Sequence, residues 1–200
     1  MIKIYIIAVF TLLVSCKKGT SNVAIESAKD FQYQKNIEFA NKSKSPLTDE
    51  DFNHFVTLDF YPIAEKFIIN AKFVRTPNEK PFKMLTTTSR VVDYIKFGEA
   101  HFSLQNKQHK LDIYQNLELI KKDGFQNHLF LPFMDVTNGM TTYPGGRYLD
   151  LEQPKTDMIS IDFNQSYNPY CAYNDKYSCP IPPSENTLKI AIEAGVKKFH

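Results

Sequence analysis

An alternation of apolar and polar residues with a period of two is the feature that most constrains how this 200-residue chain can fold. Phe67, Ile69 and Phe73 stand at alternate positions of residues 67–74. The same alternation recurs in residues 111–115, 158–163 and 188–193. Successive side chains of a β-strand point to opposite faces of its sheet, so the pattern predicts strands with one face buried.

Strands are also expected at residues 82–87, 91–95, 99–105 and 128–133. The pair Asn106-Lys107 stands where a tight turn would join 99–105 to a strand that contains 111–115. About eight strands with short connections are typical of an antiparallel sandwich or a partly open barrel. We therefore expect a mainly β fold.

One or two helices are expected ahead of the sheet. Residues 28–42 carry apolar residues among charges and contain neither glycine nor proline, which indicates a helix. Thr48 stands three residues before Asp51, the spacing of a capping box, and predicts the start of a short helix over 49–56. We expect these helices to cap the sheet.

The N-terminus has the features of an export signal. Lys3 is the one charged residue ahead of an apolar run of 11 residues, Ile4–Val14, whereas a membrane-spanning helix needs about 20. The following Leu13-Val14-Ser15-Cys16 resembles the lipobox of bacterial lipoproteins. In those precursors the cysteine is acylated and the peptide is cut before it. A plain signal peptide or a short buried helix is the alternative.

The lipoprotein interpretation divides the chain into three parts. Residues 1–15 are the signal peptide, 16–26 are a polar tether, and 27–200 form a single β-rich domain. The expected partner is the lipid bilayer, held through acylated Cys16, because two or more acyl chains give stable anchoring. The expected location is the bacterial cell envelope, facing the periplasm.

Composition excludes several classes of protein. Apolar residues make up 42% and charged residues 23% of the chain, which excludes a disordered or collagen-like protein. The net charge of +2 gives no reason to expect a nucleic acid as partner. The chain contains neither Gly-x-Gly-x-x-Gly nor a Walker loop, so no cofactor is expected.

Two stretches do not follow the strand pattern. Residues 135–150 hold Gly139, Gly145 and Gly146, and residues 164–186 hold four prolines and four of the tyrosines. Proline hinders both helix and strand pairing, and a long irregular loop in a compact domain is usually functional or held by special contacts. Neither stretch has pairing partners of its own, so we expect the two to fold toward each other.

At these residues the chain resembles the uncharacterised DUF1684 family. The resemblance covers about residues 27–199, and it depends on Asp135–Gly139, Tyr143–Leu149, Ile161–Asn164, Tyr167–Tyr173, Cys179–Pro183, Glu185-Asn186 and Ala194-Gly195. Pro144 departs from the family pattern, where glycine is expected. The family name implies no activity, but the likeness is concentrated in the two irregular stretches and supports a site there.

Cys171 and Cys179 lie in the second irregular stretch. In an exported protein such a pair predicts a disulfide first. Two buried free thiols are the second interpretation. A zinc site completed by Asp162 or Glu185 is the third, although the spacing matches no zinc signature, so no metal is expected.

The two stretches also supply polar groups for a ligand pocket. The guanidinium of Arg147 suits a carboxylate or phosphate. The candidate ligand-binding residues are Arg147, Tyr148, Asp162, Asn164, Tyr167, Asn168, Glu185 and Asn186. Alternatively, Arg147 pairs with Asp162 or Asp150, and the asparagines satisfy the backbone of the loops.

Three functions remain open at this point. The first is a binding module for a small polar or anionic molecule near Arg147. The second is a hydrolase-like enzyme that uses Asp162, Glu185 or a cysteine, although no catalytic residue is identified and enzyme status stays open. The third is a structural or interaction lipoprotein in which both stretches only stabilise the fold.

Overall fold

The computed structural model describes residues 18–200, so the predictions of a signal peptide and a lipobox lie outside the described part of the chain. Helix α1 (Lys18–Ala40) begins ten residues before the expected Ala28, and most of the segment predicted as a tether is therefore helical. Helix α2 (Asp49–His54) begins where predicted, because the N–H of Asp51 donates to Oγ1 of Thr48 at 3.1 Å. Neither helix, within residues 18–200, is long and apolar enough to cross a membrane.

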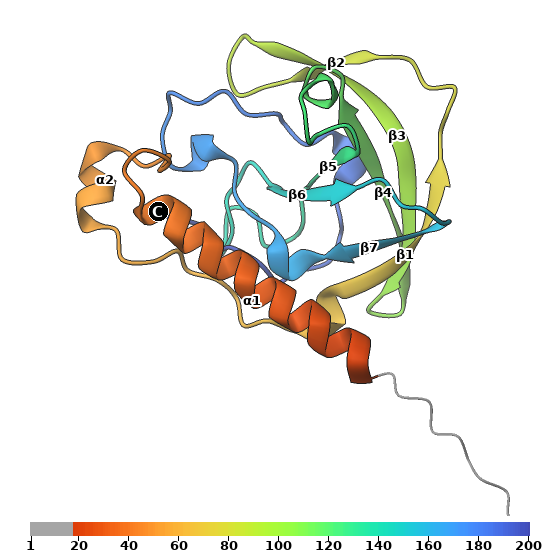
Figure 1. Ribbon diagram of the computed structural model, residues 1–200, viewed down its shortest axis with the longest axis horizontal. Helices are drawn as coiled ribbons and strands as arrows, with labels where there is room; N and C mark the ends of the chain where they lie inside the picture. Colours follow the sequence, from red (N-terminus) through yellow and green to blue (C-terminus); the bar gives the residue numbers. More distant parts are fainter. Residues whose placement is uncertain (1–17) are drawn as a thin grey trace, which may run out of the picture.

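A single antiparallel sheet forms the body of the protein and curls into a half-barrel (Figure 1). Its strands run in the order β6-β5-β4-β3-β1-β7, with β2 paired to β3. Their bounds are β1 (Ile68–Arg75), β2 (Phe82–Leu85), β3 (Val91–Leu104), β4 (Lys107–Asn116), β5 (His128–Phe133), β6 (Arg147–Glu152) and β7 (Met158–Asp162). The predicted mainly β, partly open barrel is confirmed, with seven strands in these residues instead of about eight.

The two strands expected at 91–95 and 99–105 are one long strand, β3. A register shift between Lys96 and Gly98 interrupts its pairing with β4, which explains why the alternation breaks there. A side chain at Gly98 would lie 2.7 Å from the carbonyl oxygen of Val74, so only glycine fits. The turn between β3 and β4 lies at Gln105 and Asn106, with φ of 53° and 58°, one residue before the predicted pair.

Two of the assignments predicted from the sequence were wrong. Residues 147–150 were predicted as part of an irregular stretch but belong to β6, which pairs with β5 along its whole length. Residues 188–193 were predicted as a strand but form none. Their backbone makes two hydrogen bonds to the segment that follows β5, from the N–H of Leu188 to the carbonyl oxygen of Met134 at 2.8 Å and from the N–H of Val136 to the carbonyl oxygen of Ile190 at 3.2 Å. Leu188, Ile190 and Ile192 are nevertheless buried, because an extended segment presents alternate side chains to a core whether or not its backbone joins a sheet.

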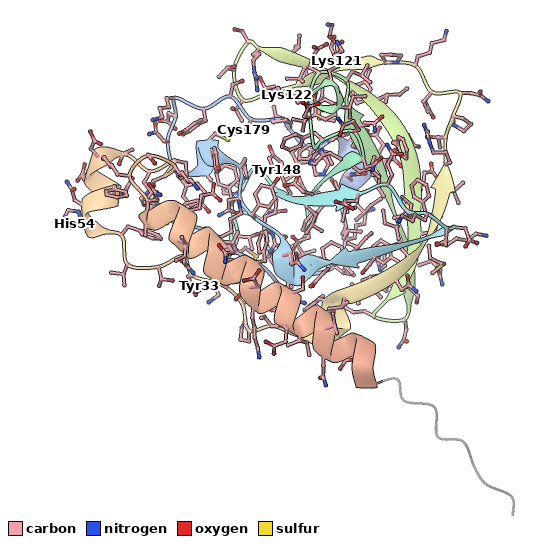
Figure 2. All side chains as sticks on the ribbon, in the orientation of Figure 1. Tyr33, His54, Lys121, Lys122, Tyr148 and Cys179 are labelled. Carbon is pink, nitrogen blue, oxygen red and sulfur yellow. The ribbon has the colours of Figure 1, made fainter. Side chains whose placement is uncertain are left out.

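The core fills the inside of the curled sheet. It combines alternate residues of the strands with the extended C-terminal segment, and includes Phe67, Ala71, Leu111, Leu131, Phe133, Leu149 and Ile192. Helix α1 lies along the open side of the sheet (Figure 1) and buries Ala28 and Phe39, whereas Tyr33 faces outward (Figure 2).

Short 3-10 turns connect the remaining segments. They are η1 (Glu65–Phe67), η2 (Leu119–Lys121), η3 (Phe163–Gln165), η4 (Tyr170–Ala172) and η5 (Ser184–Asn186). After η3 the chain returns to the far edge of the sheet, where Tyr148 of β6 and Tyr167 exchange backbone hydrogen bonds of 2.9 and 3.0 Å. The two irregular stretches therefore fold toward each other, as predicted.

Gly195 tests how tightly the C-terminal segment is held. Its φ is +74°, and a methyl group there would lie 2.6 Å from the carbonyl oxygen of Ser166. We expect Gly195→Ala to lower the free energy of unfolding by about 2–5 kcal/mol, because an unfavourable φ and a clash add together.

Gly124→Ala is the matched control, since Gly124 has a φ of +85° but no atom near its missing side chain. Gly124→Ala should lower the free energy of unfolding by no more than about 1–2 kcal/mol, the cost of the backbone conformation alone. Urea unfolding measures both variants, and equal losses would contradict close packing at Gly195.

Candidate functional site

Arg147 lies at the start of β6 and is completely buried, with a relative exposure of 0%. Its Nη2 contacts Oδ2 of Asp135 at 2.8 Å, and both side chains are inaccessible to solvent. The partner is thus Asp135, and the expected pairing with Asp150 or Asp162 is wrong. Burial lowers the pKa of the guanidinium, while the nearby carboxylate of Asp135 opposes that shift.

The remaining contacts of Arg147 are with the extended C-terminal segment. The guanidinium donates to the carbonyl oxygens of Ile192 at 2.8 Å and of Ala194, and Oδ1 of Asp135 accepts the N–H of Ile192 at 3.1 Å. The ion pair therefore satisfies backbone groups that have no sheet partner. Arg147 contacts the protein's own backbone instead of lining a surface pocket.

Asn164 and Asp162 stabilise the turn that follows β7. The amide of Asn164, which is fully buried, bonds both the N–H and the carbonyl oxygen of Ala64, at 2.9 and 3.1 Å. The carboxylate of Asp162 accepts the N–H of Asn164 at 3.0 Å and the side chain of Gln165 at 3.1 Å. These groups act within the fold, as the structural alternative expected.

Asn186 and Asn168 have similar roles. Asn186 is fully buried and bonds the N–H and carbonyl oxygen of Asp112, both at 2.8 Å. Asn168 donates to the carbonyl oxygen of Lys197 at 2.9 Å, and its own oxygen is buried without a hydrogen-bond partner. Glu185 is exposed in η5, where local hydrogen bonds lower its pKa.

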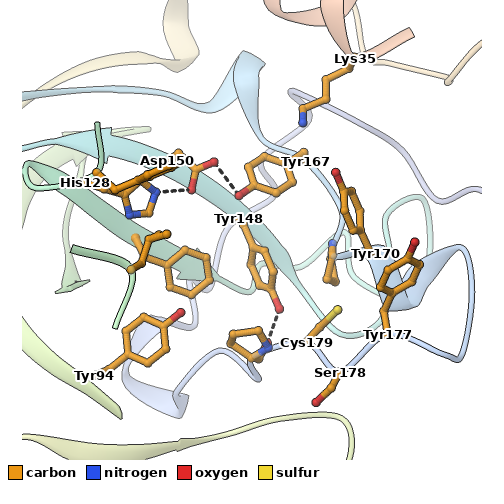
Figure 3. A pocket seen from close by; sticks show the side chains of 15 residues that line it. Lys35, Tyr94, His128, Tyr148, Asp150, Tyr167, Tyr170, Tyr177, Ser178 and Cys179 are labelled. Atoms are coloured by element: carbon orange, nitrogen blue, oxygen red, sulfur yellow. Dashed lines mark hydrogen bonds and ion pairs between the residues drawn. The ribbon is translucent and has the colours of Figure 1, made fainter. Parts of the chain in front are cut away.

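Tyr148 and Tyr167 differ from the other predicted residues because they line a pocket (Figure 3). The pocket has a volume of about 390 Å³. Seven of its fifteen lining residues are aromatic: Tyr94, Phe125, Phe130, Tyr148, Tyr167, Tyr170 and Tyr177. The other lining residues are Lys35, Leu119, His128, Asp150, Pro169, Ser178, Cys179 and Pro180.

Strands β5 and β6 explain why these side chains meet. Leu129 and Leu149 point into the core, so the alternate residues of the two strands point to the opposite face. That face presents His128 and Phe130 from β5, with Tyr148 and Asp150 from β6. The segment 167–180 lies over this face and completes the pocket.

A chain of hydrogen bonds forms the polar end of the pocket. Asp150 lies 2.9 Å from Nε2 of His128 and accepts the hydroxyl of Tyr167 at 2.8 Å (Figure 3). Burial and the adjacent Asp150 raise the pKa of Tyr167 well above its ordinary value, so this hydroxyl remains a donor. Asp150 itself is 53% exposed and has room to accept a further hydrogen bond.

Lys35 of α1 brings a cation to the rim. Its Nζ lies 5.1 Å from the centre of the Tyr167 ring and 2.9 Å from Oε2 of Glu38. Glu38 in turn accepts the hydroxyl of Tyr170, which raises the pKa of that tyrosine beyond the effect of burial. Helix α1 is thereby tied to the wall of the pocket.

Cys171 and Cys179 are free thiols in the structure and lie next to each other. The N–H of Cys171 donates to Sγ of Cys179 at 3.2 Å. The disulfide stays a prediction. No group of three or more histidine, cysteine or acidic residues in residues 18–200 is arranged to hold a metal ion, so the zinc interpretation gains no support there.

Sequence reasoning missed several lining residues. His128, Phe130 and Asp150 were not singled out because which face of a strand carries the pocket depends on what covers it. Tyr170 and Tyr177 gave a usable signal, since four tyrosines are concentrated in residues 164–186. No sequence pattern could identify Lys35, because α1 is far from the other lining residues in the sequence and reaches the pocket only in the folded protein.

The chain belongs to the DUF1684 family, proteins of unknown function, whose model matches residues 53–197. The predicted resemblance is therefore confirmed. A solved structure with a similar fold is the solution NMR structure of an uncharacterised protein from Haloarcula marismortui, which is 28% identical in sequence. The alignment covers 91% of this chain and 97% of that one, with a TM-score of 0.71. No curated protein matches the sequence.

The role of Arg147 can be tested by its removal. Arg147→Met leaves the carboxylate of Asp135 buried without its ion-pair partner, so we expect the free energy of unfolding to fall by about 3–5 kcal/mol. Urea denaturation at neutral pH measures the loss.

Lys83→Met is the control, because Lys83 pairs with Asp93 at 2.7 Å on the surface and is 63% exposed. That variant should lose no more than about 1 kcal/mol. A loss for Arg147→Met as small as that of the control would show that the buried pair does not hold the C-terminal segment.

Proposed function

We propose that this protein is a lipid-anchored binding module whose pocket takes a small molecule with a flat apolar face and a polar or anionic edge. The observation that carries the proposal is the pocket of about 390 Å³ with seven aromatic side chains and polar groups at its ends. Its volume lies in the range of about 300–1,000 Å³ that is common for small-molecule sites.

The chemistry of the lining supports this class of ligand. Aromatic rings bury flat apolar surface and stack in offset or edge-to-face geometry. Asp150 offers an acceptor, and Lys35 offers a cation at the rim. The binding site is therefore proposed on the Tyr148 and Tyr167 side of β6, in place of the expected position near Arg147.

The enzyme alternative has one observation in its favour, the contact of Asp150 with both His128 and Tyr167. A carboxylate that orients a histidine is a common arrangement for a general base. Nδ1 of His128, however, is buried without a hydrogen-bond partner. Asp162 and Glu185 give no support to a carboxylate pair, because Asp162 holds a turn and Glu185 is exposed in another turn. Binding is the better supported function.

The proposed anchoring depends on the sequence of the N-terminus. The apolar run Ile4–Val14 and the following Leu13–Cys16 segment have the order of a lipoprotein signal. Acylation of Cys16 would hold the domain at a membrane of the bacterial cell envelope, on the periplasmic side. Because α1 begins at Lys18, two residues after Cys16, the anchor would join the domain through a helix.

The pocket can be tested with N-phenyl-1-naphthylamine, an uncharged aromatic probe that fluoresces more strongly in apolar surroundings. We expect saturable binding to the protein and at least a tenfold weaker affinity for Leu119→Trp, about 1.4 kcal/mol, because the larger side chain fills the pocket. Ile120→Trp is the control, since Ile120 is the neighbour of Leu119 in η2 and does not line the pocket.

Equal affinities of these two variants would contradict binding at this pocket. A second probe, 8-anilino-1-naphthalenesulfonate, has the same ring system with a sulfonate added. Tighter binding of the sulfonate than of the uncharged probe would identify an anionic edge on the natural ligand, and the reverse order would identify a neutral polar one.

The anchor can be tested by metabolic labelling in a bacterial host with radioactive palmitate. We expect the protein to take up label and to fractionate with membranes, and Cys16→Ser to lose both properties because the acylated thiol is removed. Cys171→Ser is the control and should keep the label. An unlabelled protein in the wild-type strain would contradict the proposed lipoprotein.

A further inference from the structure

We propose that Cys171 and Cys179 are a redox-active pair, in which Cys171 exchanges with an external disulfide and Cys179 resolves the mixed disulfide. The proposal does not depend on whether the pocket binds a ligand. It goes beyond a stabilising disulfide, because it gives the two sulfurs different roles.

The positions of the two cysteines support these roles. Cys171 lies in η4 and is partly accessible to solvent, whereas Cys179 is buried with a relative exposure of 7%. An external disulfide can therefore approach Cys171 more readily than Cys179, which is nearly buried at the wall of the pocket. Thiol–disulfide exchange needs this combination of one accessible attacking sulfur and one adjacent sulfur to complete the reaction.

The protein holds Cys179 rigidly beside its partner. Its N–H donates to Oγ1 of Thr87 at 3.1 Å, and its carbonyl oxygen accepts the N–H of Thr87 at 2.9 Å. The N–H of Cys171 then donates to Sγ of Cys179 at 3.2 Å. The two thiols are close enough to shift the pKa of each other, so closing a disulfide requires only local movement.

The surroundings favour the thiolate at Cys171. The thiol of Cys179 donates toward the Cys171 sulfur and lowers the pKa of Cys171 to about 6, with a further contribution from Tyr143. The hydroxyl of Tyr143 lies 3.8 Å from Sγ of Cys171. The same contact raises the pKa of Cys179, and the positive charge of Arg90 partly opposes that rise. The thiolate is the attacking species in exchange, so these shifts agree with the assigned roles.

The exchange balances as two displacements. The Cys171 thiolate attacks one sulfur of an external disulfide, forms a mixed disulfide and releases the other sulfur as a thiolate. Cys179 then loses its proton and attacks Sγ of Cys171, which releases the second external thiolate. The pair loses two electrons and two protons, and the external disulfide is reduced to two thiols.

The experiment uses the full-length chain with Cys16→Ser, so that Cys171 and Cys179 are the remaining cysteines. The reduced protein is mixed with oxidised glutathione, quenched with acid and analysed by mass spectrometry with peptide mapping. We expect it to lose two hydrogens and keep no glutathione. With Cys179→Ala added, glutathione should stay attached to Cys171, and with Cys171→Ala the remaining Cys179 should stay unmodified.

Two results would overturn the redox activity of the pair, and a third would overturn the roles of its two sulfurs. One is a wild-type pair that remains as two thiols in oxidised glutathione, and the other is a disulfide that reduced glutathione cannot reopen. The second result would leave a purely structural disulfide. Attachment of glutathione to Cys179 in preference to Cys171 would also contradict the assigned roles.

The rate of alkylation of Cys171 by iodoacetamide gives an independent test, because it requires no substitution at either cysteine of the pair. We expect the rate to rise with pH through a midpoint near pH 6, because the thiolate predominates above its pKa of about 6. An ordinary thiol reaches its midpoint at about pH 8.5. A midpoint above pH 8 in the reduced protein would contradict an activated Cys171.

Discussion

The buried ion pair of Arg147 and Asp135 is the interaction on which the rest of this structure depends. A charge pair removed from water is favourable only if its geometry is good and its other hydrogen-bonding groups are satisfied. Here the guanidinium and the carboxylate also bond backbone groups of the C-terminal segment, including those of Ile192 and Ala194. At these two residues they take the place of a neighbouring strand. The half-barrel can therefore end in an extended chain that packs into the core without joining the sheet.

This replacement explains where the sequence was informative and where it was not. The period of two correctly predicted β1 and β7, and it correctly predicted that alternate residues of 188–193 are buried. It could not distinguish a strand from an extended segment whose backbone bonds partly to a loop and partly to side chains, because both bury every second residue. Strand β6 was missed for a different reason. Its six residues follow a glycine-rich loop, and the partner that makes them a strand, β5, is defined only by the fold.

The candidate site was predicted in part. The expectation that the two irregular stretches meet was correct, since Tyr148 and Tyr167, one from each stretch, exchange backbone hydrogen bonds. The asparagines and Asp162 were equally compatible with a ligand site and with turn stabilisation, since a carboxamide that satisfies a loop has the same chemistry as one that binds a ligand. Only the position of the partner decides, as Asn186 shows by bonding both backbone groups of Asp112.

Strand β6 shows why the structural and the proposed binding roles can be so close together in the sequence. Arg147 and Leu149 point toward the core, and Tyr148 and Asp150 point toward the pocket. Neighbouring residues thus belong to opposite faces of one sheet, and the ion pair fixes the strand that positions the pocket. A change on the pocket face alters the lining without exposing the core, whereas a change at Arg147 displaces both. The geometry of the pocket is therefore a consequence of how the chain buries its C-terminal segment.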